Sequence, residues 1–378
     1  MATQRYYRPE LDVLRLIAFL SVFFTHRMDL APIDATKYFW GYHISLVGVF
    51  GVPVFFLLSA FLITELLTRE QEQTGKVHPK AFYARRILRI WPLYFTVFFG
   101  LVLLAYFFPV FGKIPKTAWA AFSLFAGNWY ICINQWIHSY PINPLWSISV
   151  EEQFYILIPL IAAYSSRRVM KVTSFLFIGI AYVFIFNYAR HPISGFSSEW
   201  TNSFVQFQFF AAGILLSLYL KGRQPKWKLI VRFFMALAAL GCWLIASMVC
   251  GIHADAPHLS TEFEAISGWL LILLGAILLF LSLLGISDKF LPKPLVYLGR
   301  ISYGLYVFHA LMFFLVFIIF KDELAEFSKI LHLYEWRNSI GAVVAFILTV
   351  SVATLSYRFF EKPFLRLKKR FTFIASRD

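Results

Sequence analysis

The sequence is built from apolar runs, ten of which have about the length that a helix needs to cross a lipid bilayer. A spanning helix takes about 20 predominantly apolar residues and satisfies its own backbone polar groups. Hydrophobic residues make up 60% of the chain and charged residues only 15%, against about 25% charged residues in an average soluble domain. We therefore expect an all-α, polytopic membrane bundle that forms a single domain over residues 1–378. The predicted spans are 11–27, 46–67, 90–108, 150–164, 173–188, 203–220, 233–250, 265–284, 302–320 and 339–358.

An eleventh apolar stretch, residues 118–133, does not fit this series. It is short and contains Asn128. Counting it as a span would also invert every later loop and destroy the charge asymmetry described next. We predict a re-entrant or interfacial helix here, on the outer side of the membrane.

The basic residues are distributed unevenly between the two sets of alternate loops. The net charge of +15 could by itself indicate nucleic-acid binding. However, 25 of the 35 lysine and arginine residues fall on one side and 8 on the other. This asymmetry is the positive-inside pattern of a membrane protein. It predicts a multi-pass protein of the inner (plasma) membrane, with the lipid bilayer and not nucleic acid as its partner, and with cytoplasmic termini that include a basic tail at 362–378.

Arg15 and His26 lie within the first apolar run, where an ionisable residue is expensive and indicates function. Eleven positions are close to three helical turns, so both side chains share one face, about 16 Å apart along the axis. An arginine can hold a phosphate or carboxylate. A histidine can move a proton near neutral pH.

Two adjacent carboxylates, Glu151 and Glu152, open the fourth span. Opposite chain directions put them near the outer side, where we expect His26 as well. A carboxylate that orients an imidazole makes a general base, so His26, Glu151 and Glu152 are the candidate catalytic residues. Adjacent positions on a helix point about 100° apart, and we expect Glu152 to face inward. A structural alternative is a capping box, in which Ser149 caps the helix and Glu152 completes the box.

Arg86 and Arg89 are neighbours on one helix face at the cytoplasmic mouth of the third span. Together with Arg15 they could form a pocket for a polyphosphate. The alternative is an ordinary positive-inside flank, to which Arg85 also belongs. The three cysteines form no metal-type motif, and we predict neither a metal site nor a disulfide framework.

Two further polar features favour structural roles. His309 lies at membrane depth, and a packing or polar-relay role suits it better than catalysis. Arg358 and Glu361 are three residues apart, which predicts an ion pair at the inner boundary.

Six motifs in order give the chain its resemblance to a known family. They are ELDVLR (10–15) with the histidine at 26, FFLLSAFLI (55–63), RILRIWPLY (86–94), WSISVEEQFY (146–155), LGRISYGLYVFH (298–309) and YRFFEKPF (357–364). Over residues 9–367 the sequence resembles the acyltransferase 3 family of integral membrane acyltransferases, which includes bacterial polysaccharide O-acetylases. It departs from the family pattern at Ala60, where a glycine is frequent. Many members also carry a soluble esterase-like domain after the last span, whereas this sequence stops soon after it.

The resemblance implies transfer of an acyl group, most simply acetyl, from cytoplasmic acyl-CoA to a sugar hydroxyl of a surface polysaccharide or glycolipid. The first-helix Arg and His of the family correspond to Arg15 and His26, and its basic pair corresponds to Arg86 and Arg89. We expect these arginines to bind the phosphates of acyl-CoA. The candidate substrate-binding residues, as donors to the oxyanion, are Trp146, Ser147 and Tyr155.

Two mechanistic and functional alternatives stay open at this point. His26 could act as a base or become acylated itself. Ten spans with buried charges would also suit a secondary transporter or a flippase of lipid-linked sugars. That class predicts Gly- or Pro-broken helices in two repeated halves, and no such repeat is evident.

Overall fold

The computed structural model describes residues 6–25, 46–193, 197–254 and 261–374, and all regular elements in these ranges are helices. Short 3₁₀ and π turns join several of them. The α-helices of the first half are α1 (Pro9–Thr25), α3 (Gly51–Thr74), α4 (Pro79–Phe107), α5 (Lys116–Ser123), α6 (Gly127–Asn134), α7 (Trp146–Tyr164), α8 (Arg167–Arg190) and α9 (Ser198–Thr201). Those of the second half are α10 (Ser203–Leu220), α11 (Leu229–Met248), α12 (Glu262–Leu283), α13 (Lys293–Arg300), α14 (Ser302–Phe314), α15 (Lys321–Ile330), α16 (Arg337–Leu355) and α17 (Lys362–Lys368).

The expectation of an all-α membrane bundle is confirmed. Within the described ranges, nine helical segments are long and apolar enough to cross a membrane. They coincide with nine of the ten predicted spans, and the 17-residue α1 corresponds to the tenth. The main difference is at α4, which begins at Pro79, well before the predicted start at 90, because its basic first turns continue the helix beyond the apolar run.

The stretch 118–133 forms two short helices, α5 and α6, of eight residues each. Each is about 12 Å long at 1.5 Å per residue, too short to span a bilayer. The chain turns between them at Phe125, which has a left-handed φ of 53°. The prediction that this stretch is not a span is therefore confirmed.

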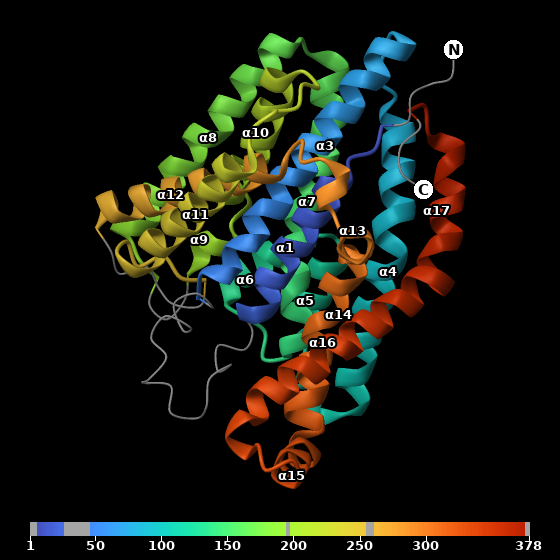
Figure 1. Cartoon of the computed structure of the whole chain (residues 1–378), viewed down its shortest axis with the longest axis vertical. Coiled ribbons are helices and arrows are strands. Elements are labelled where there is room, and N and C mark those ends of the chain that lie inside the picture. Colours follow the sequence, from blue (N-terminus) through green and yellow to red (C-terminus); the bar gives the residue numbers. More distant parts are fainter. Residues whose placement is uncertain (1–5, 26–45, 194–196, 255–260, 375–378) are drawn as a thin grey trace.

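Helix α3 lies at the centre of the bundle, where it packs against α1, α7, α10 and α12. Helices α8 and α11 lie at the edge (Figure 1) and keep only about a fifth of their apolar windows buried. Their outward side chains include Phe175 and Val183 on α8 and Phe233 and Phe234 on α11, all more than half exposed. Such apolar faces suit contact with lipid tails.

Helix α1 runs against α3 in the opposite direction at very short range. A Cβ added to Gly51 would strike the backbone carbonyl of Ala18, and one added to Gly48 would strike that of Ser21. Small residues permit this approach, as is usual between membrane helices. The contacts also fix the register between the two helices, since the start of α3 lies beside the end of α1.

Gly299 allows α13 to approach α1, because a Cβ there would overlap the backbone of Asp12. We therefore expect Gly299→Ala to destabilise the protein by about 1–3 kcal/mol, the usual cost of forcing extra atoms into a packed contact. The measurement is the thermal midpoint of the detergent-solubilised protein. Gly100→Ala is the matched control, since a Cβ at Gly100 meets nothing within 4 Å and alanine favours helix. Equal midpoints for the two variants would contradict this packing argument.

The capping-box alternative for Ser149 and Glu152 is wrong. Helix α7 begins at Trp146, directly after a 3₁₀ turn that contains Pro141 and Pro144. Ser149 therefore lies inside the helix, and its hydroxyl faces the carbonyl of Leu145.

The predicted ion pair between Arg358 and Glu361 is also wrong. Residues Ser356–Glu361 form a π-helical turn, in which positions three apart no longer face each other as they do in an α-helix. The Glu361 carboxylate accepts a hydrogen bond from Ser356 at 3.2 Å. The Arg358 guanidinium lies over the Phe359 ring.

Candidate functional site

A cavity of about 170 Å³ lies among α1, α3, α4, α7 and α14. Six of the nine predicted site residues line it, although they come from three helices far apart in sequence. They are Arg15 on α1, Arg86 and Arg89 on α4, and Ser147, Glu151 and Tyr155 on α7. The structure thus brings the predicted basic residues and one of the two carboxylates to a single cavity.

The other three predicted residues do not line it. Trp146 is buried beside the cavity and packs edge-on against Phe56. Glu152 does not line the cavity, and its carboxylate accepts a hydrogen bond from Trp91 Nε1 on α4 at 2.9 Å. His26 lies outside the described residues.

Two of the cations near this site are already neutralised. Arg15 forms an ion pair with Asp12 at 2.8 Å, and Arg85 forms one with Glu70, also at 2.8 Å. Arg85 in addition donates to the carbonyl of Phe371 in the C-terminal segment. Arg85 therefore acts as a structural clamp and does not line the main cavity.

Arg86 and Arg89 line the cavity, and neither has an acidic partner within 4 Å among the residues that the structure describes. The Arg86 guanidinium lies over the Tyr155 ring, 5.1 Å from its centroid. A guanidinium on an aromatic face keeps its donors available for a second contact. The two arginines are therefore the candidate anion-binding groups of the cavity.

Two carboxylates line the cavity: Asp12, which is paired with Arg15, and Glu151. Glu151 Oε1 accepts a hydrogen bond from Ser59 Oγ at 2.8 Å, across the contact between α3 and α7. Ser59 in turn accepts one from the Tyr155 hydroxyl at 3.2 Å. We expected Glu152 to be the inward residue of the pair. Glu151 is the one that reaches the cavity, where it is partly exposed, whereas Glu152 is buried outside it.

Glu151 lies at the level of Arg15 and not at that of Thr25. Thr25 lies beside Gly48, and Ser59 lies eleven residues farther along α3. That separation is about 16 Å. On α1, no residue after Arg15 lines the cavity. The predicted depth match between His26 and the glutamates rests on a residue outside the described ranges, and the described helices place Glu151 well away from the end of α1.

A hydroxyl pair from α7 and α14 lines the cavity. Ser147 Oγ lies 2.7 Å from the Tyr306 hydroxyl, and both hydroxyls contact the carbonyl of Pro144. Beyond Tyr306 the helix continues to His309, which is fully buried and has Nδ1 2.5 Å from the Tyr306 carbonyl. His309 also packs against the Phe19 ring. These contacts agree with a packing or relay role for His309.

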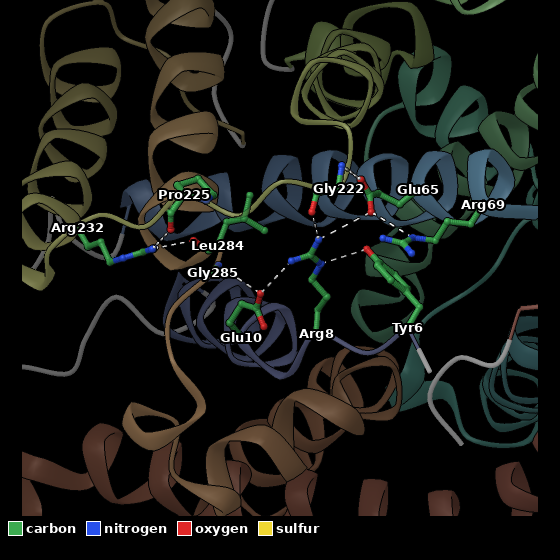
Figure 2. Close-up of polar contacts among 10 residues, drawn as sticks. All are labelled: Tyr6, Arg8, Glu10, Glu65, Arg69, Gly222, Pro225, Arg232, Leu284 and Gly285. Atoms are coloured by element: carbon green, nitrogen blue, oxygen red, sulfur yellow. Dashed lines mark hydrogen bonds and ion pairs between the residues drawn. The ribbon is translucent and has the colours of Figure 1, made fainter. Parts of the chain in front are cut away.

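The mouth of the cavity is held by a buried ionic network that the sequence did not reveal (Figure 2). Arg8, which lines the mouth, lies 3.8 Å from Glu10 and 3.9 Å from Glu65. Its guanidinium also donates to the carbonyl of Gly222, in the loop after α10. Glu10 accepts from the backbone N–H of Gly285, in the loop after α12. Arg69 adds a second cation, 3.7 Å from Glu65. The network ties the segment before α1 to two loops, and its two arginines offset its two glutamates, so it serves as a frame and not as an anion site.

Tyr6 completes this network at the mouth. Its hydroxyl accepts a hydrogen bond from Arg8 Nε at 3.3 Å. Burial, together with the nearby charge of Glu65, raises the pKa of the Tyr6 hydroxyl. Tyr6 therefore stays neutral at physiological pH and contributes no charge to the mouth.

The residues that the sequence reasoning missed are Ser59, Tyr306 and Arg8. Ser59 had a signal, because it is a polar residue within the apolar run of the predicted span 46–67. Tyr306 stands in a motif that we noted, but its distance in sequence from Ser147 concealed their contact. The described ranges contain no cluster of three or more potential metal ligands.

Sequence comparison with known proteins identifies a family for this chain. A family model described as an acyltransferase domain matches residues 8–358. The chain belongs to this acyltransferase family. No solved structure gives a significant match.

Similar proteins come from Staphylococcus aureus. "Putative O-acetyltransferase SAS0844" of strain MSSA476 is 27% identical over 383 residues, which cover 95% of this chain and 57% of that protein. "O-acetyltransferase OatA" of strain NCTC 8325 is 26% identical over 396 residues, which cover 98% of this chain and 59% of that protein. The chain thus spans less than two thirds of the length of these relatives. Family and fold together make it a multi-pass membrane protein of the acyltransferase family.

Proposed function

We propose that the protein is a membrane O-acyltransferase that takes an acyl group, most simply acetyl, from cytoplasmic acyl-CoA. The observation that carries the proposal is the cavity that Glu151 lines together with Arg86 and Arg89, neither of which has an acidic partner within 4 Å among the described residues. The family match and the names of the relatives support the reaction class. An unbalanced guanidinium pair suits the phosphates of a donor.

The proposed orientation follows from the basic residues. Helix α1 begins, and α17 lies, toward the same end of the bundle (Figure 1). The connections after α3, α7 and α10, together with the first turns of the helices that follow them, are rich in lysine and arginine, which favours the cytoplasm for this end. Arg86 and Arg89 lie in the first turns of α4, which starts at this end. Acyl-CoA would therefore enter the cavity from the cytoplasm of the inner (plasma) membrane.

The proposed chemistry is direct transfer. The oxygen of the acceptor hydroxyl attacks the thioester carbonyl, the carbon–sulfur bond breaks, and the hydroxyl proton passes through the base to the leaving thiolate. His26 is the proposed base, as the family resemblance implies, and Glu151 is the proposed carboxylate of the site. The hydroxyl pair Ser147–Tyr306 lines this cavity and would lie beside the acyl arm. Acylation of His26 is the alternative route to the same products.

The proposed acceptor is a hydroxyl of a surface polysaccharide or glycolipid. It rests on the resemblance to polysaccharide O-acetylases and on the relatives being named O-acetyltransferases. The test uses inverted membrane vesicles that carry the protein, supplied with acetyl-CoA labelled in the acetyl group. We expect label in the glycan or glycolipid fraction as an ester that mild base releases, and loss of such esters from cells without the gene. Movement of sugar across the vesicle membrane without any ester would instead support a transporter.

A further inference from the structure

We propose that Ser59 is a positioning residue that holds the Glu151 carboxylate away from the arginines of the cavity. The inference rests on the proposed acyl transfer and adds to it a residue that acts through Glu151. Its basis is a hydrogen-bonded chain from Tyr155 to Ser59 and from Ser59 to Glu151. All three side chains line the cavity.

The hydroxyl of Ser59 is used differently from those of other helical serines in this protein. Ser174, Ser282 and Ser328 each donate to a carbonyl one turn earlier in their own helix. This is the common way for a buried hydroxyl to be satisfied within a helix. Ser59 instead donates to a side chain of another helix, at 2.8 Å. Its hydroxyl is therefore directed at the carboxylate.

The charges around Glu151 explain why its carboxylate must be kept in position. Glu151 shares the cavity with Arg15, Arg86 and Arg89, yet none of these arginines lies within ion-pair distance of it among the described contacts. Opposite charges that line one cavity attract each other. A carboxylate that swung onto Arg86 would neutralise the anion site and leave its own position. The hydrogen bond from Ser59 opposes this movement.

Tyr155 supplies the second half of the arrangement. It lies one helical turn after Glu151 on α7 and donates to Ser59 Oγ at 3.2 Å, so the Ser59 proton is directed to the carboxylate. The Arg86 guanidinium lies over the Tyr155 ring and is held there. One aromatic side chain thus orients the hydroxyl and retains the cation. This geometry keeps the two charges apart while both face the cavity.

The test compares Ser59→Ala with Ser59→Thr, which keeps the hydroxyl, in the labelled acetyl-CoA assay. We expect Ser59→Ala to lower kcat on the order of tenfold, which corresponds to the loss of one hydrogen bond to a charged group. We expect KM for acetyl-CoA to rise as well, because a released carboxylate competes for the arginines. Ser59→Thr should recover most of both losses. Ser174→Ala is the matched control, since it removes a buried helical hydroxyl away from the cavity.

A double variant separates positioning from general structural damage. If Ser59 acts through Glu151, Ser59→Ala in a Glu151→Gln background should cause no further loss of kcat. Additive losses, or unchanged kinetics of Ser59→Ala, would overturn the proposal. Should Ser59→Ala fail to fold, Tyr155→Phe provides the second test, and an unchanged KM for acetyl-CoA in that variant would count against the hydroxyl chain. If Glu151→Gln were itself fully active, the proposed role of the carboxylate would fail, which is a different outcome from failure of Ser59 alone.

Discussion

Glu151→Gln is expected to lower acyl transfer at least on the order of a hundredfold, the usual contribution of a positioned acid or base. The substitution removes the only carboxylate of α7 that lines the cavity, and the amide keeps its size and can still accept from Ser59. Fold and membrane insertion should therefore be retained. The measurement is kcat for ester formation from labelled acetyl-CoA, with elution of the solubilised protein as the check on folding.

Glu152→Gln makes the comparison informative, since the two glutamates are adjacent in sequence. Glu152 lies outside the cavity and accepts a hydrogen bond from Trp91, which glutamine can also accept. We expect its variant to retain far more activity than that of Glu151. The reverse order of activities would assign the chemistry to Glu152 and contradict the role drawn from the cavity.

His26→Ala belongs to the same prediction, because His26 is the proposed base. Its loss should also lower the rate of acyl transfer on the order of a hundredfold or more and leave the protein in the membrane. Full activity of this variant would exclude both His26 as the base and His26 as an acylated intermediate.

The sequence predicted the spans well for a physical reason. Each span must satisfy its backbone within one helix and face lipid or other apolar helices, so local composition alone records it. The same logic explains why 118–133 was recognised as too short and too polar to cross. Prediction from local composition fails at Ser356–Glu361, because a π-helical turn depends on packing with neighbouring helices and leaves no local signature in the sequence.

The candidate site was predicted in part. A charged residue beside or within an apolar run is conspicuous in the sequence. For that reason Arg15, Arg86, Arg89 and Glu151 were recognised as candidate site residues. Their partners were not, because Ser59 and Glu151 meet through the crossing of α3 and α7, 92 residues apart in sequence. The choice between Glu151 and Glu152 depended on the rotation of α7, which local sequence does not fix. The depth of the glutamates was inferred only from the opposite directions of the first and fourth predicted spans. That inference placed them too near the end of α1.

The arginines of α4 provide the second large prediction, because three of them share one short segment but differ in their partners. The double variant Arg86→Gln, Arg89→Gln is expected to raise KM for acetyl-CoA on the order of a hundredfold. Each lost charge-assisted contact with a phosphate costs about 1.5–3 kcal/mol. In the part of the chain that the structure describes, neither guanidinium group has an acidic partner within 4 Å that would be left unpaired. The measurement is the dependence of initial transfer rate on acetyl-CoA concentration.

Arg85→Gln is the comparison that separates anion binding from a positive-inside flank. Arg85 is paired with Glu70, is absent from the main cavity, and holds the C-terminal segment through Phe371. If the segment served only to set topology, removal of any of these arginines would have similar consequences, since that effect depends on the number of charges. If the cavity binds phosphates, the variant at Arg85 should lose stability and keep its KM. Because the charge change per residue is the same in all three positions, a selective rise of KM at Arg86 and Arg89 can arise only from where their guanidinium groups lie.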